Sequence, residues 1–468
     1  MFKGKVYQMT SLPFGLATAP KVFASLSNWV TQKLRERGLR VIVYLDDFLL
    51  AHQDKQTLSV QAIEAVHLLE TLGWQINYAK SILTPQKSLE FLGITWDPWH
   101  GIKSLPDAKC TVLKEKILQV LCRQSVRLKE IQSLIGRINF ASFVVPRGRL
   151  NHRELIQFSL SLPANNFSRR YWVPKQSLKE LKWWLRHHNW PSALHKPPIE
   201  HFLATDASGL AWGARLDKWQ LSGRWSPQET LLHSNQKEML AVLHVLRERG
   251  PYLKDSSVML QCDNKTTIAY LRKEGGTKSS SLMGITRKVF KLLDQYNIHL
   301  TAHHIPGRFN GEADHISRLR TDPEWHLLPE VTQVIFQKWG VPLVDLMASK
   351  SAHVVPQYVS LDMLDQKALF HDAFSRNWDF PLAWVFPPPF LIPKVLSHLN
   401  SAKGTYLIVA PKWEKVFWKP DIRNRSLSPP FTIHRLHRVL VDTLTGLPPK
   451  KVHEMTLQVW RCGGGLVN

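Results

Sequence analysis

Four acidic residues between positions 206 and 314 have the type and spacing of a site that binds two metal ions. They are Asp206, Glu238, Asp263 and Asp314. Hard cations such as Mg2+ bind carboxylate oxygens, and several carboxylates must converge to hold two ions about 4 Å apart. Two such ions hydrolyse a phosphodiester, because one activates a water molecule and the other stabilises the leaving oxygen. The four acids are therefore candidates for the ligands of such a site.

Each acid also has a structural interpretation that involves no chemistry. Asp206 could form an Asx turn, and Glu238 could close a helix capping box. Asp263 could be the N-cap of a helix, and Asp314 could lie on the solvated face of a short one. The metal site is favoured by the set as a whole and not by any single acid.

The elements around these acids predict how they would be brought together. Residues 200–320 alternate strand-like and helix-like patterns, which is typical of an α/β domain. Asp206 ends the apolar run 202–204, and Asp263 ends the run 258–260. Because acids at the carboxyl ends of neighbouring strands meet at one rim of such a sheet, we expect the four to converge there.

A second pair of acids lies near the N-terminus. Asp46 and Asp47 separate the apolar runs 41–44 and 48–50, which predicts a strand–turn–strand hairpin. Two carboxylates at a hairpin tip suit the two metals of a polymerase, which lie beside the primer end. An ordinary Asp-rich β-turn is the alternative.

The neighbourhood of this hairpin resembles the later palm motifs of reverse transcriptases, in order and spacing. The motifs are Leu12-Pro13-Phe14-Gly15-Leu16-Ala17-Thr18-Ala19-Pro20, Tyr44-Leu45-Asp46-Asp47, Gly73-Trp74-Gln75-Ile76-Asn77 with Lys80 and Ser81, and Phe91-Leu92-Gly93-Ile94. The resemblance implies that Asp46 and Asp47 are metal-site carboxylates. Residues 128–149 resemble the thumb of the same family, an interpretation compatible with a structural helical hairpin.

The same resemblance implies contacts to nucleic acid. Pro13, Phe14 and Gly15 would shape the pocket for template and nucleotide. The turn at Leu92 and Gly93 would grip the primer. Lys80 would be a proton donor or a phosphate contact, with a solvated surface lysine as the alternative.

One palm feature departs from the family. In reverse transcriptases the first palm motif carries an aspartate that ligates both metals, and it lies upstream of the Pro-Phe-Gly segment. Here the only acid before Asp46 is Glu36, which lies in a basic helical stretch. We therefore expect the fingers, one metal ligand and a palm strand to be lacking, and polymerase activity to be absent in the isolated chain.

The four acids of the first set lie in strings that resemble the RNase H of retroelements. These are Thr205-Asp206-Ala207-Ser208, Gln236-Lys237-Glu238, Cys262-Asp263-Asn264, Ala313-Asp314, and His304-Ile305-Pro306-Gly307 with Asn310. The resemblance implies that the acids bind two Mg2+ or Mn2+ ions and that the domain cuts RNA in RNA–DNA hybrids. It makes His304 an accessory residue, with structural packing beside the site as the favoured role.

Small polar residues after Asp263 are candidates for contacts to the hybrid backbone. Asn264, Thr266 and Thr267 precede or open a helical stretch, and helix N-termini and small polar groups suit phosphates. Helix capping is the equal alternative for all three.

The C-terminal segment resembles a phage-type adenine methyltransferase. The resemblance rests on residues 344–349, Asp372-Ala373-Phe374 with Trp378, and residues 384–390. That family places Asn or Asp before Pro-Pro-aromatic, whereas Pro387 occupies this position here. We therefore expect a remnant without methylation activity, with an unrelated α/β packing domain as the alternative. The order of the three segments resembles DIRS-type retroelements.

Length and pattern predict an α/β multidomain protein, because 468 residues exceed one core. We expect a partial palm at 1–105, a helical thumb or connection at 106–195, an RNase H domain with a mixed α/β sheet at 200–320, a degenerate methyltransferase-like domain at 325–420 and a basic C-terminal tail at 421–468. The proline-containing stretch from His188 to Pro198 is expected to be a linker.

The charge predicts a polyanionic partner. Lys and Arg number 61 against 37 Asp and Glu, a formal charge of +24. We expect RNA–DNA hybrid and template-primer as partners, and a full-length reverse transcriptase chain where the palm is completed in trans. No membrane partner is expected, since no apolar run reaches about 18 residues.

Location and an alternative function follow from the same features. The N-terminus lacks a signal-peptide pattern, and four cysteines without CxxC spacing suit a reducing compartment, so we expect an intracellular protein, cytoplasmic or nuclear. The alternative to an enzyme is a non-catalytic nucleic-acid-binding remnant of a decayed or co-opted element. A cellular RNase H with accessory domains is disfavoured by the palm motifs.

Overall fold

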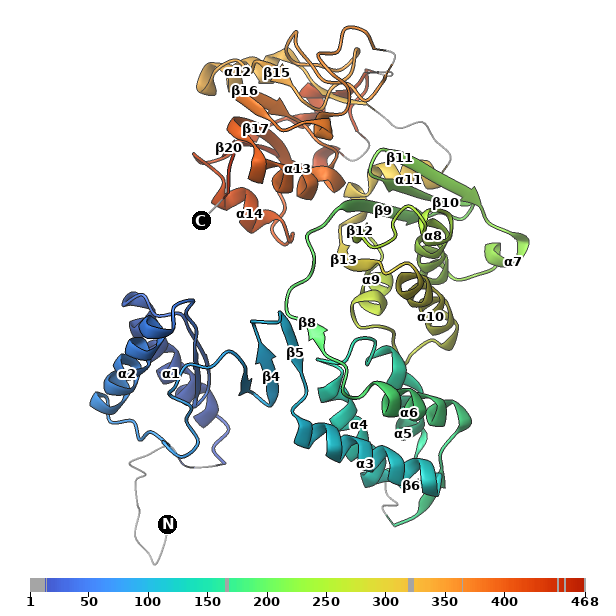
Figure 1. Ribbon diagram of the computed structural model, residues 1–468. Coiled ribbons are helices and arrows are strands. Elements are labelled where there is room, and N and C mark those ends of the chain that lie inside the picture. The colour runs from blue at the N-terminus through green and yellow to red at the C-terminus, as the bar shows by residue number, and fades with distance from the viewer. Residues whose placement is uncertain are drawn as a thin grey trace, which may run out of the picture. The chain divides into compact units, whose positions relative to one another are not determined.

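The computed structural model of the chain describes residue 13 and residues 15–164, 168–318, 324–363, 365–443, 446–449 and 452–466. The chain divides into two compact units, residues 1–195 and 196–468, and each is described by itself (Figure 1). Within the described ranges, none of the helices combines the length and apolar character needed to span a membrane.

The first unit begins with a small helix–hairpin–helix arrangement. It consists of α1 (Ala19–Glu36), β1 (Val41–Tyr44), β2 (Asp47–Leu50) and α2 (Lys55–Thr71). Val30 and Leu34 of α1 pack with Val41 and with Ala65 and Leu69 of α2. Among the described residues, β1 and β2 pair antiparallel and form a two-stranded sheet.

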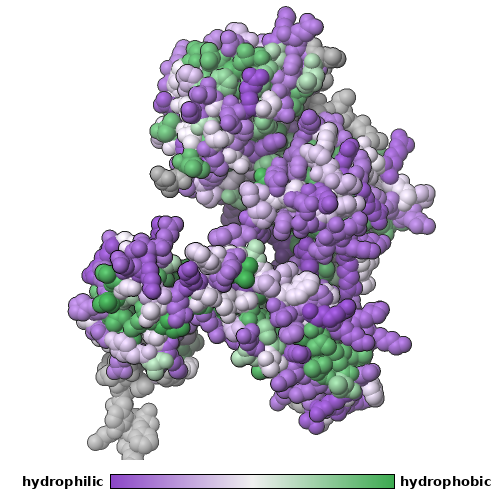
Figure 2. Space-filling view, viewed as in Figure 1, coloured by the Kyte–Doolittle hydropathy of each residue, from purple (hydrophilic) through white to green (hydrophobic). Residues whose placement is uncertain are grey.

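One face of this hairpin is left open. Ile42 is 59% exposed and Tyr44 58% exposed on β1. Hydrophobic side chains are visible on the surface of the α1–α2 part in Figure 2. Side chains of this kind are normally covered by a neighbouring strand or helix, so the described part of the palm-like segment is an incomplete layer.

The rest of the first unit combines a small antiparallel sheet with a helical cluster. The sheet has the order β3 (Leu89–Phe91), β4 (Ile94–Asp97), β5 (Ile102–Ser104) and β8 (Ser192–Ala193). The cluster contains α3 (Asp107–Arg123), α4 (Leu128–Ala141), α5 (Arg153–Ser161) and α6 (Lys175–His187), with η1 (Leu150–His152) and the pair β6 (Ser125–Arg127) and β7 (Arg170–Trp172). The predicted helical patterns at 113–121 and 128–135 are confirmed, because their apolar residues form the core of this cluster.

The second unit opens with a mixed five-stranded sheet. Its strands are β9 (His201–Ala207), β10 (Ala211–Leu216), β11 (Trp219–Arg224), β12 (Ser257–Cys262) and β13 (His299–His304), in the order β11-β10-β9-β12-β13. β10 pairs antiparallel with both β11 and β9, and β12 is parallel to both β9 and β13. The predicted mixed α/β sheet in this region is confirmed.

Helices follow and connect these strands. They are α7 (Pro227–Thr230), α8 (Ser234–Arg249), α9 (Lys265–Arg272), α10 (Ser280–Gln295), η2 (Gly307–Phe309) and α11 (Gly311–Ser317). The long helices α8 and α10 lie side by side (Figure 1), and α8 packs on β9. The short helix α11 packs on β9 and β10. The carboxyl ends of β9 and β12 therefore lie between α8 and α11.

The C-terminal part of the second unit has its own sheet. The order is β15 (Val344–Asp345), β16 (Asp379–Val385), β17 (Lys403–Pro411), β20 (Leu457–Gly463) and β18 (Phe431–Ile433). The surrounding elements are β14 (Trp325–Leu327), α12 (Pro329–Trp339), η3 (Ala373–Ser375), η4 (Pro389–Leu391), α13 (Ile392–His398), η5 (Leu399–Ser401), α14 (Lys419–Asn424), α15 (Leu436–Val439), β19 (Leu440–Asp442) and η6 (Val452–Glu454).

The expectation of a basic tail at 421–468 is wrong. The strand β20 lies inside the sheet, where it pairs antiparallel with β17 from Thr405↔Gly463 to Pro411↔Leu457. Val459 and Cys462 are fully buried, and β19 pairs with β14. The strand was missed because it is buried on both faces, so it lacks the polar–apolar alternation that marks a half-exposed strand.

The Pro-Pro-Phe segment has a structural contact within this unit. Phe390 and Leu391 are buried with Ala204 of β9 and Ala313 of α11. The buried amide of Gln261 donates from Nε2 to the carbonyl oxygen of Phe390 at 2.5 Å. The segment that resembled a methyltransferase motif therefore packs against the strand and helix that carry Asp206 and Asp314.

Candidate active site

Two of the predicted acids lie at the carboxyl ends of adjacent parallel strands. Asp206 is the penultimate residue of β9, and Asp263 directly follows β12. The Cα partners Cys262↔Thr205 place these two strand ends at the same rim. This rim is the location that the apolar runs before each acid predicted.

The other two acids come from helices that pack against that rim. Glu238 lies on α8 and is 7% exposed, close to the 6% of Asp206. Asp314 lies on α11, where Arg318 donates from Nε to its Oδ1 at 2.7 Å. The structure thus brings the whole predicted set to one end of the sheet.

The tightest cluster contains one residue that the sequence did not predict. Ligand atoms of Glu238, Cys262 and Asp263 all lie within 4.8 Å of one another. The thiol of Cys262 donates to Oε2 of Glu238 at 3.7 Å. Burial raises the pKa of Cys262 well above its usual value, so the thiol is neutral and supports the carboxylate as a weak donor.

The acids perturb one another as a close group of like charges does. Burial, together with the charges of Asp263 and Asp314, raises the pKa of Asp206 to about 6. Burial raises the pKa of Glu238 to about 9, with added contributions from Asp206 and Asp263. The pKa of Asp263 is also raised by burial, while the charge of His304 lowers it. Clustered carboxylates of this kind are typical of functional sites.

The donor set fits a hard divalent cation. Carboxylate oxygens are the ligands that Mg2+ prefers, and their number at this rim exceeds the positive charge nearby. Arg318, whose side chain is 49% exposed, is the one cation paired with the set among the described residues. A bound cation would relieve the repulsion that raises the pKa values of Asp206 and Glu238.

Two glycines make the close approach possible. A Cβ added at Gly213, the partner of Asp206 on β10, would lie 2.3 Å from the backbone nitrogen of Ser317. Glycine at this position therefore lets α11 lie directly on the sheet. A Cβ at Gly307 would lie 2.7 Å from Oδ2 of Asp263. The latter glycine ends the His-Ile-Pro-Gly string, and its lack of a side chain leaves room for the carboxylate.

Supporting hydrogen bonds hold the strand end and α11 together. Ser317 Oγ donates to Asp206 Oδ2 at 2.5 Å. Ser208 Oγ donates to the carbonyl oxygen of Ser317 at 2.7 Å, and Asn310 Nδ2 donates to that of Thr205 at 2.8 Å. Sequence reasoning missed Ser317, because nothing in its local sequence indicates that a residue 111 positions away is its partner.

The three residues after Asp263 that were predicted to contact the hybrid have different surroundings in the structure. Asn264 caps α9 by accepting from the backbone nitrogen of Thr267 at 2.9 Å, and its Nδ2 donates to Asn235 Oδ1. Thr267 is fully buried, so its side chain cannot reach a bound backbone, and that prediction is wrong. Thr266 is half-buried and keeps the predicted access.

His304 has the structural role that was favoured for it. It is the last residue of β13, and its Nε2 lies 3.0 Å from the carbonyl oxygen of Asp263. It therefore lies beside the acids and holds the backbone of Asp263.

The predicted polymerase acids lie on the exposed turn of the β1–β2 hairpin. Tyr44 pairs with Asp47, and Leu45 adopts a φ of +54° at the turn. Asp46 and Asp47 are both exposed, and no third acidic, His or Cys side chain completes a close group with them in the described part of the chain. Glu36 pairs with Lys33 at 2.9 Å, as expected of a helix-surface residue.

The other palm residues divide by position. Pro13 and Gly15 lie before α1, while Phe14 falls outside the described residues. Lys80 is exposed in a turn, in agreement with either of its interpretations.

The Leu92-Gly93 turn has the backbone that a tight hairpin requires. Both residues have positive φ values, +52° and +74°, and they join β3 to β4. Lys109 Nζ donates to the carbonyl oxygen of Gly93 at 2.8 Å. Leu92 is 41% exposed, so its side chain is available to a ligand.

Comparisons with known proteins assign both regions. Residues 2–96 match the family model of reverse transcriptase (RNA-dependent DNA polymerase). Residues 196–296 match the model of the RNase H-like domain found in reverse transcriptase. The chain therefore combines a reverse transcriptase segment with an RNase H-like domain, as the two resemblances predicted.

Curated relatives are polyproteins. The enzymatic polyprotein of carnation etched ring virus is 25% identical over 329 residues, which cover 66% of this chain and 46% of that protein. The transposon Tf2-3 polyprotein of Schizosaccharomyces pombe is 25% identical over 347 residues, 68% of this chain and 23% of its own length. The chain thus spans less than half the length of these relatives.

Solved structures that match parts of the chain include a foamy viral protease-reverse transcriptase in complex with RNA/DNA hybrid. It has a TM-score of 0.35 and 18% identity, covering 64% of this chain and 39% of that one. LC11-RNase H1 in complex with RNA/DNA hybrid has a TM-score of 0.23 and 18% identity, covering 26% of this chain and 97% of that one.

Proposed function

We propose that the RNase H-like domain is a ribonuclease that cuts the RNA strand of RNA–DNA hybrids with two Mg2+ or Mn2+ ions. The observation that carries this proposal is the convergence of Asp206, Glu238, Asp263 and Asp314 at one rim of the sheet. When bound, the ions would supply an activated water and would stabilise the leaving 3′-oxygen.

The protein's part in the reaction is to hold and orient oxygens. Ser317 orients Asp206 through its hydroxyl, and His304 fixes the backbone of Asp263. Because the pKa of Glu238 is about 9, its carboxyl holds a proton at neutral pH that must leave before the oxygens can bind a cation. RNA would be chosen over DNA through its 2′-hydroxyl.

The test is cleavage of a labelled RNA–DNA hybrid by the purified chain with Mg2+. We expect cleavage of the hybrid but not of duplex RNA, and loss of cleavage in Asp206→Asn, Asp263→Asn and Glu238→Gln. Glu248→Gln is the matched control, because Glu248 lies on the same helix but faces Arg249. Full activity in a folded Asp263→Asn protein would refute the two-metal assignment.

For the reverse transcriptase segment we propose nucleic-acid binding without polymerisation by residues 1–468 alone. The exposed Asp46-Asp47 pair without a third ligand supports this proposal. A full-length reverse transcriptase chain is the partner that would complete the palm. This is the one respect in which the alternative of a non-catalytic nucleic-acid-binding remnant is favoured.

We further propose that the chain derives from a DIRS-type retroelement and acts inside the cell, in the cytoplasm or nucleus. The order of its segments supports the first proposal, and the unpaired, scattered cysteines support the second. We also propose that the C-terminal domain is a methyltransferase-like remnant without activity, because Pro387 has no polar side chain to hold an amine. Transfer of a methyl group from S-adenosylmethionine to DNA by the purified chain would refute this last proposal.

A further inference from the structure

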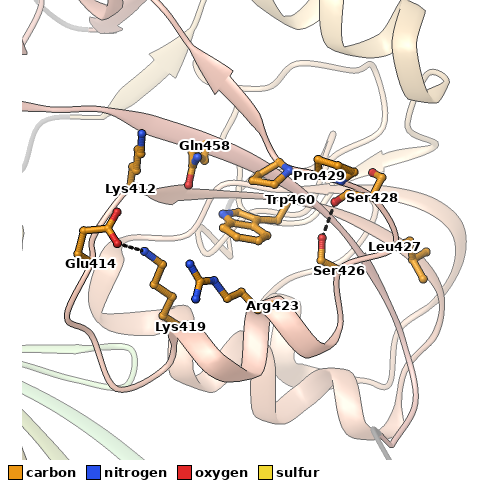
Figure 3. A pocket seen from close by; sticks show the side chains of 11 residues that line it. Lys412, Glu414, Lys419, Arg423, Ser426, Leu427, Ser428, Pro429, Gln458 and Trp460 are labelled. Atoms are coloured by element: carbon orange, nitrogen blue, oxygen red, sulfur yellow. Dashed lines mark hydrogen bonds and ion pairs between the residues drawn. The ribbon is translucent and has the colours of Figure 1, made fainter.

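A cavity of about 520 Å3 lies in the C-terminal domain, far along the chain from the four acids (Figure 3). Its wall combines residues of the loop before α14, of α14 itself, of the loop 426–430 and of β20. In Figure 3, Trp460 and Pro429 lie on one side of the hollow, and Lys419 and Arg423 lie on the other. This volume falls within the range of pockets that bind small molecules or single units of a polymer.

The wall carries an excess of positive charge. Residues 412–425 contain five basic and two acidic residues. Both acids are paired, Glu414 with Lys419 at 3.0 Å and Asp421 with Arg425 at 3.0 Å.

Lys412 and Arg423 also line the cavity. Neither forms an ion pair within 4.0 Å among the described residues, and they act on Glu414 only at longer range. Two cations without an ion pair at one hollow are suited to a ligand with a negative charge.

The opposite wall is formed by the loop 426–430 and β20, and combines apolar residues with Ser426, Ser428 and Gln458. The loop 426–430 is held by Ser426 Oγ, which donates to the carbonyl oxygen of Ser428 at 2.6 Å, and by Leu427 N, which donates to that of Arg461 at 2.7 Å. Pro429 and Pro430 restrict the loop further. Trp460 is anchored in β20 and forms part of the wall. Because hydrogen bonds and prolines already hold this loop, little conformational entropy is lost when a ligand binds, and this favours affinity.

We propose that this cavity binds one nucleotide unit of a single-stranded nucleic acid. Arg423, Lys412 and Lys419 would contact the phosphate, while Trp460 and Pro429 would face the base. A single strand fits better than a duplex, because a duplex keeps its bases stacked and offers only phosphates. The proposal is independent of RNase H activity, because no residue of the cavity belongs to the acid cluster.

The experiment is binding of a fluorescent oligothymidylate to the full chain, followed by anisotropy. We expect Arg423→Ala and Lys412→Ala each to weaken binding about three- to tenfold. Each substitution should also reduce the magnitude of the slope of log affinity against log salt by about one, the amount expected for one lost phosphate contact. Lys415→Ala is the matched control, because Lys415 is an exposed lysine of the same loop that does not line the cavity. Equal weakening by Lys415→Ala, or no weakening by Arg423→Ala, would overturn the proposed site.

Competition distinguishes a nucleotide from a simple anion. We expect thymidine monophosphate to displace the oligonucleotide from the chain at lower concentration than inorganic phosphate does, and this difference to vanish in Arg423→Ala. Equal competition by the two would overturn the base contact. Hybrid cleavage by Arg423→Ala should equal that of the parent chain, so failure of the ribonuclease proposal would be seen separately.

Discussion

Ser317 and Asp206, 111 positions apart, are joined by a hydrogen bond of 2.5 Å from the serine hydroxyl to Oδ2 of the carboxylate. Burial raises the pKa of Asp206 and this bond lowers it, so that the pKa lies at about 6 with the bond in place. The hydroxyl therefore keeps the carboxylate ionised near neutral pH, the form in which it can bind a cation.

Removing this hydroxyl should shift the pH dependence of hybrid cleavage. In Ser317→Ala the pKa of Asp206 rises, so a larger fraction is protonated at pH 6.5. We expect kcat/KM to fall about two- to tenfold there, the range of one neutral hydrogen bond, and to recover by pH 8. Ser279→Ala, which removes only the cap of α10, should leave the profile unchanged. An equal loss for Ser317→Ala at every pH would point to a packing defect.

A methyl group at Gly307 should displace the carboxylate of Asp263 without unfolding the domain. The added Cβ would lie 2.7 Å from Oδ2 of Asp263, a side-chain atom that can move. We expect Gly307→Ala to lower the rate of hybrid cleavage about 10- to 100-fold, because a small misplacement of a reacting group has effects of this size.

Gly311→Ala is the control for this substitution. A Cβ at Gly311 meets nothing within 4 Å, and the residue begins α11 four positions further along the chain. Its activity should match that of the parent chain. Circular dichroism and thermal unfolding of both variants would separate a displaced ligand from a lost fold, and normal cleavage by folded Gly307→Ala would contradict the prediction.

The buried acids should make the metal-free protein less stable as pH rises. A carboxyl group whose folded pKa is raised holds its proton more firmly in the folded state. Its favourable contribution to the free energy of unfolding is complete below the pKa of the unfolded state, which is 3.8 for Asp206 and 4.5 for Glu238. This contribution is lost as the pH rises to the pKa of the folded state, about 6 for Asp206 and about 9 for Glu238.

Glu238→Gln tests this dependence, since the amide cannot ionise. With EDTA at pH 8, we expect Glu238→Gln to raise the free energy of unfolding by about 1–3 kcal/mol, as one pKa unit corresponds to about 1.4 kcal/mol. The difference should disappear near pH 4. Mg2+ should stabilise the parent chain more at pH 8 than at pH 5 and should stabilise the variant less. A destabilised Glu238→Gln protein in EDTA would contradict this account.

The sequence allowed the acid-bearing strand ends to be predicted, because each apolar run stops at the acid and parallel strands share a rim. Other features depend on tertiary contacts that no local pattern encodes. Ser317 and Gly213 belong to the site only because α11 lies on β10, and Cys262 because its thiol meets Glu238. Thr267 was predicted to be exposed because its side chain is polar. In the structure the start of α9 turns this side chain inward, where it is buried.

Binding of the hybrid should depend strongly on salt. Each phosphate contact of a basic protein releases counterions, so affinity falls as salt rises, and this chain has a formal charge of +24. We expect the dissociation constant of the Asp206→Asn chain for an RNA–DNA hybrid to increase at least about tenfold between 50 and 200 mM NaCl. The inactive variant avoids cleavage during the measurement. A dissociation constant that stays constant over this range would show that the charge is not used for binding.

The polypeptide of residues 1–468 should fail to extend a primer on its own. Asp46 lies exposed in the two-residue turn and Asp47 lies exposed at the start of β2, and within the described residues no third ligand forms a close group with them. Two-metal transfer requires the ions to be held together, and two carboxylates from one turn leave them under-coordinated, with the primer hydroxyl poorly activated. In the part of the chain that the structure describes, the sheet that should support the turn consists of β1 and β2. Ile42 on β1 is open to solvent, so the edge of this sheet favours association with another strand.

The measurement is template-dependent incorporation of labelled nucleotides by the pure chain with Mg2+, compared with a complete reverse transcriptase. We expect no incorporation above that of the Asp46→Ala variant, while hybrid cleavage by the same preparation continues. Adding a second chain that supplies a palm strand and its aspartate is expected to allow incorporation that Asp46→Ala removes. Incorporation by the chain alone, abolished by Asp46→Ala, would show that another acid completes the site. Glu36→Gln would then test the nearest preceding candidate, which pairs with Lys33 in this structure.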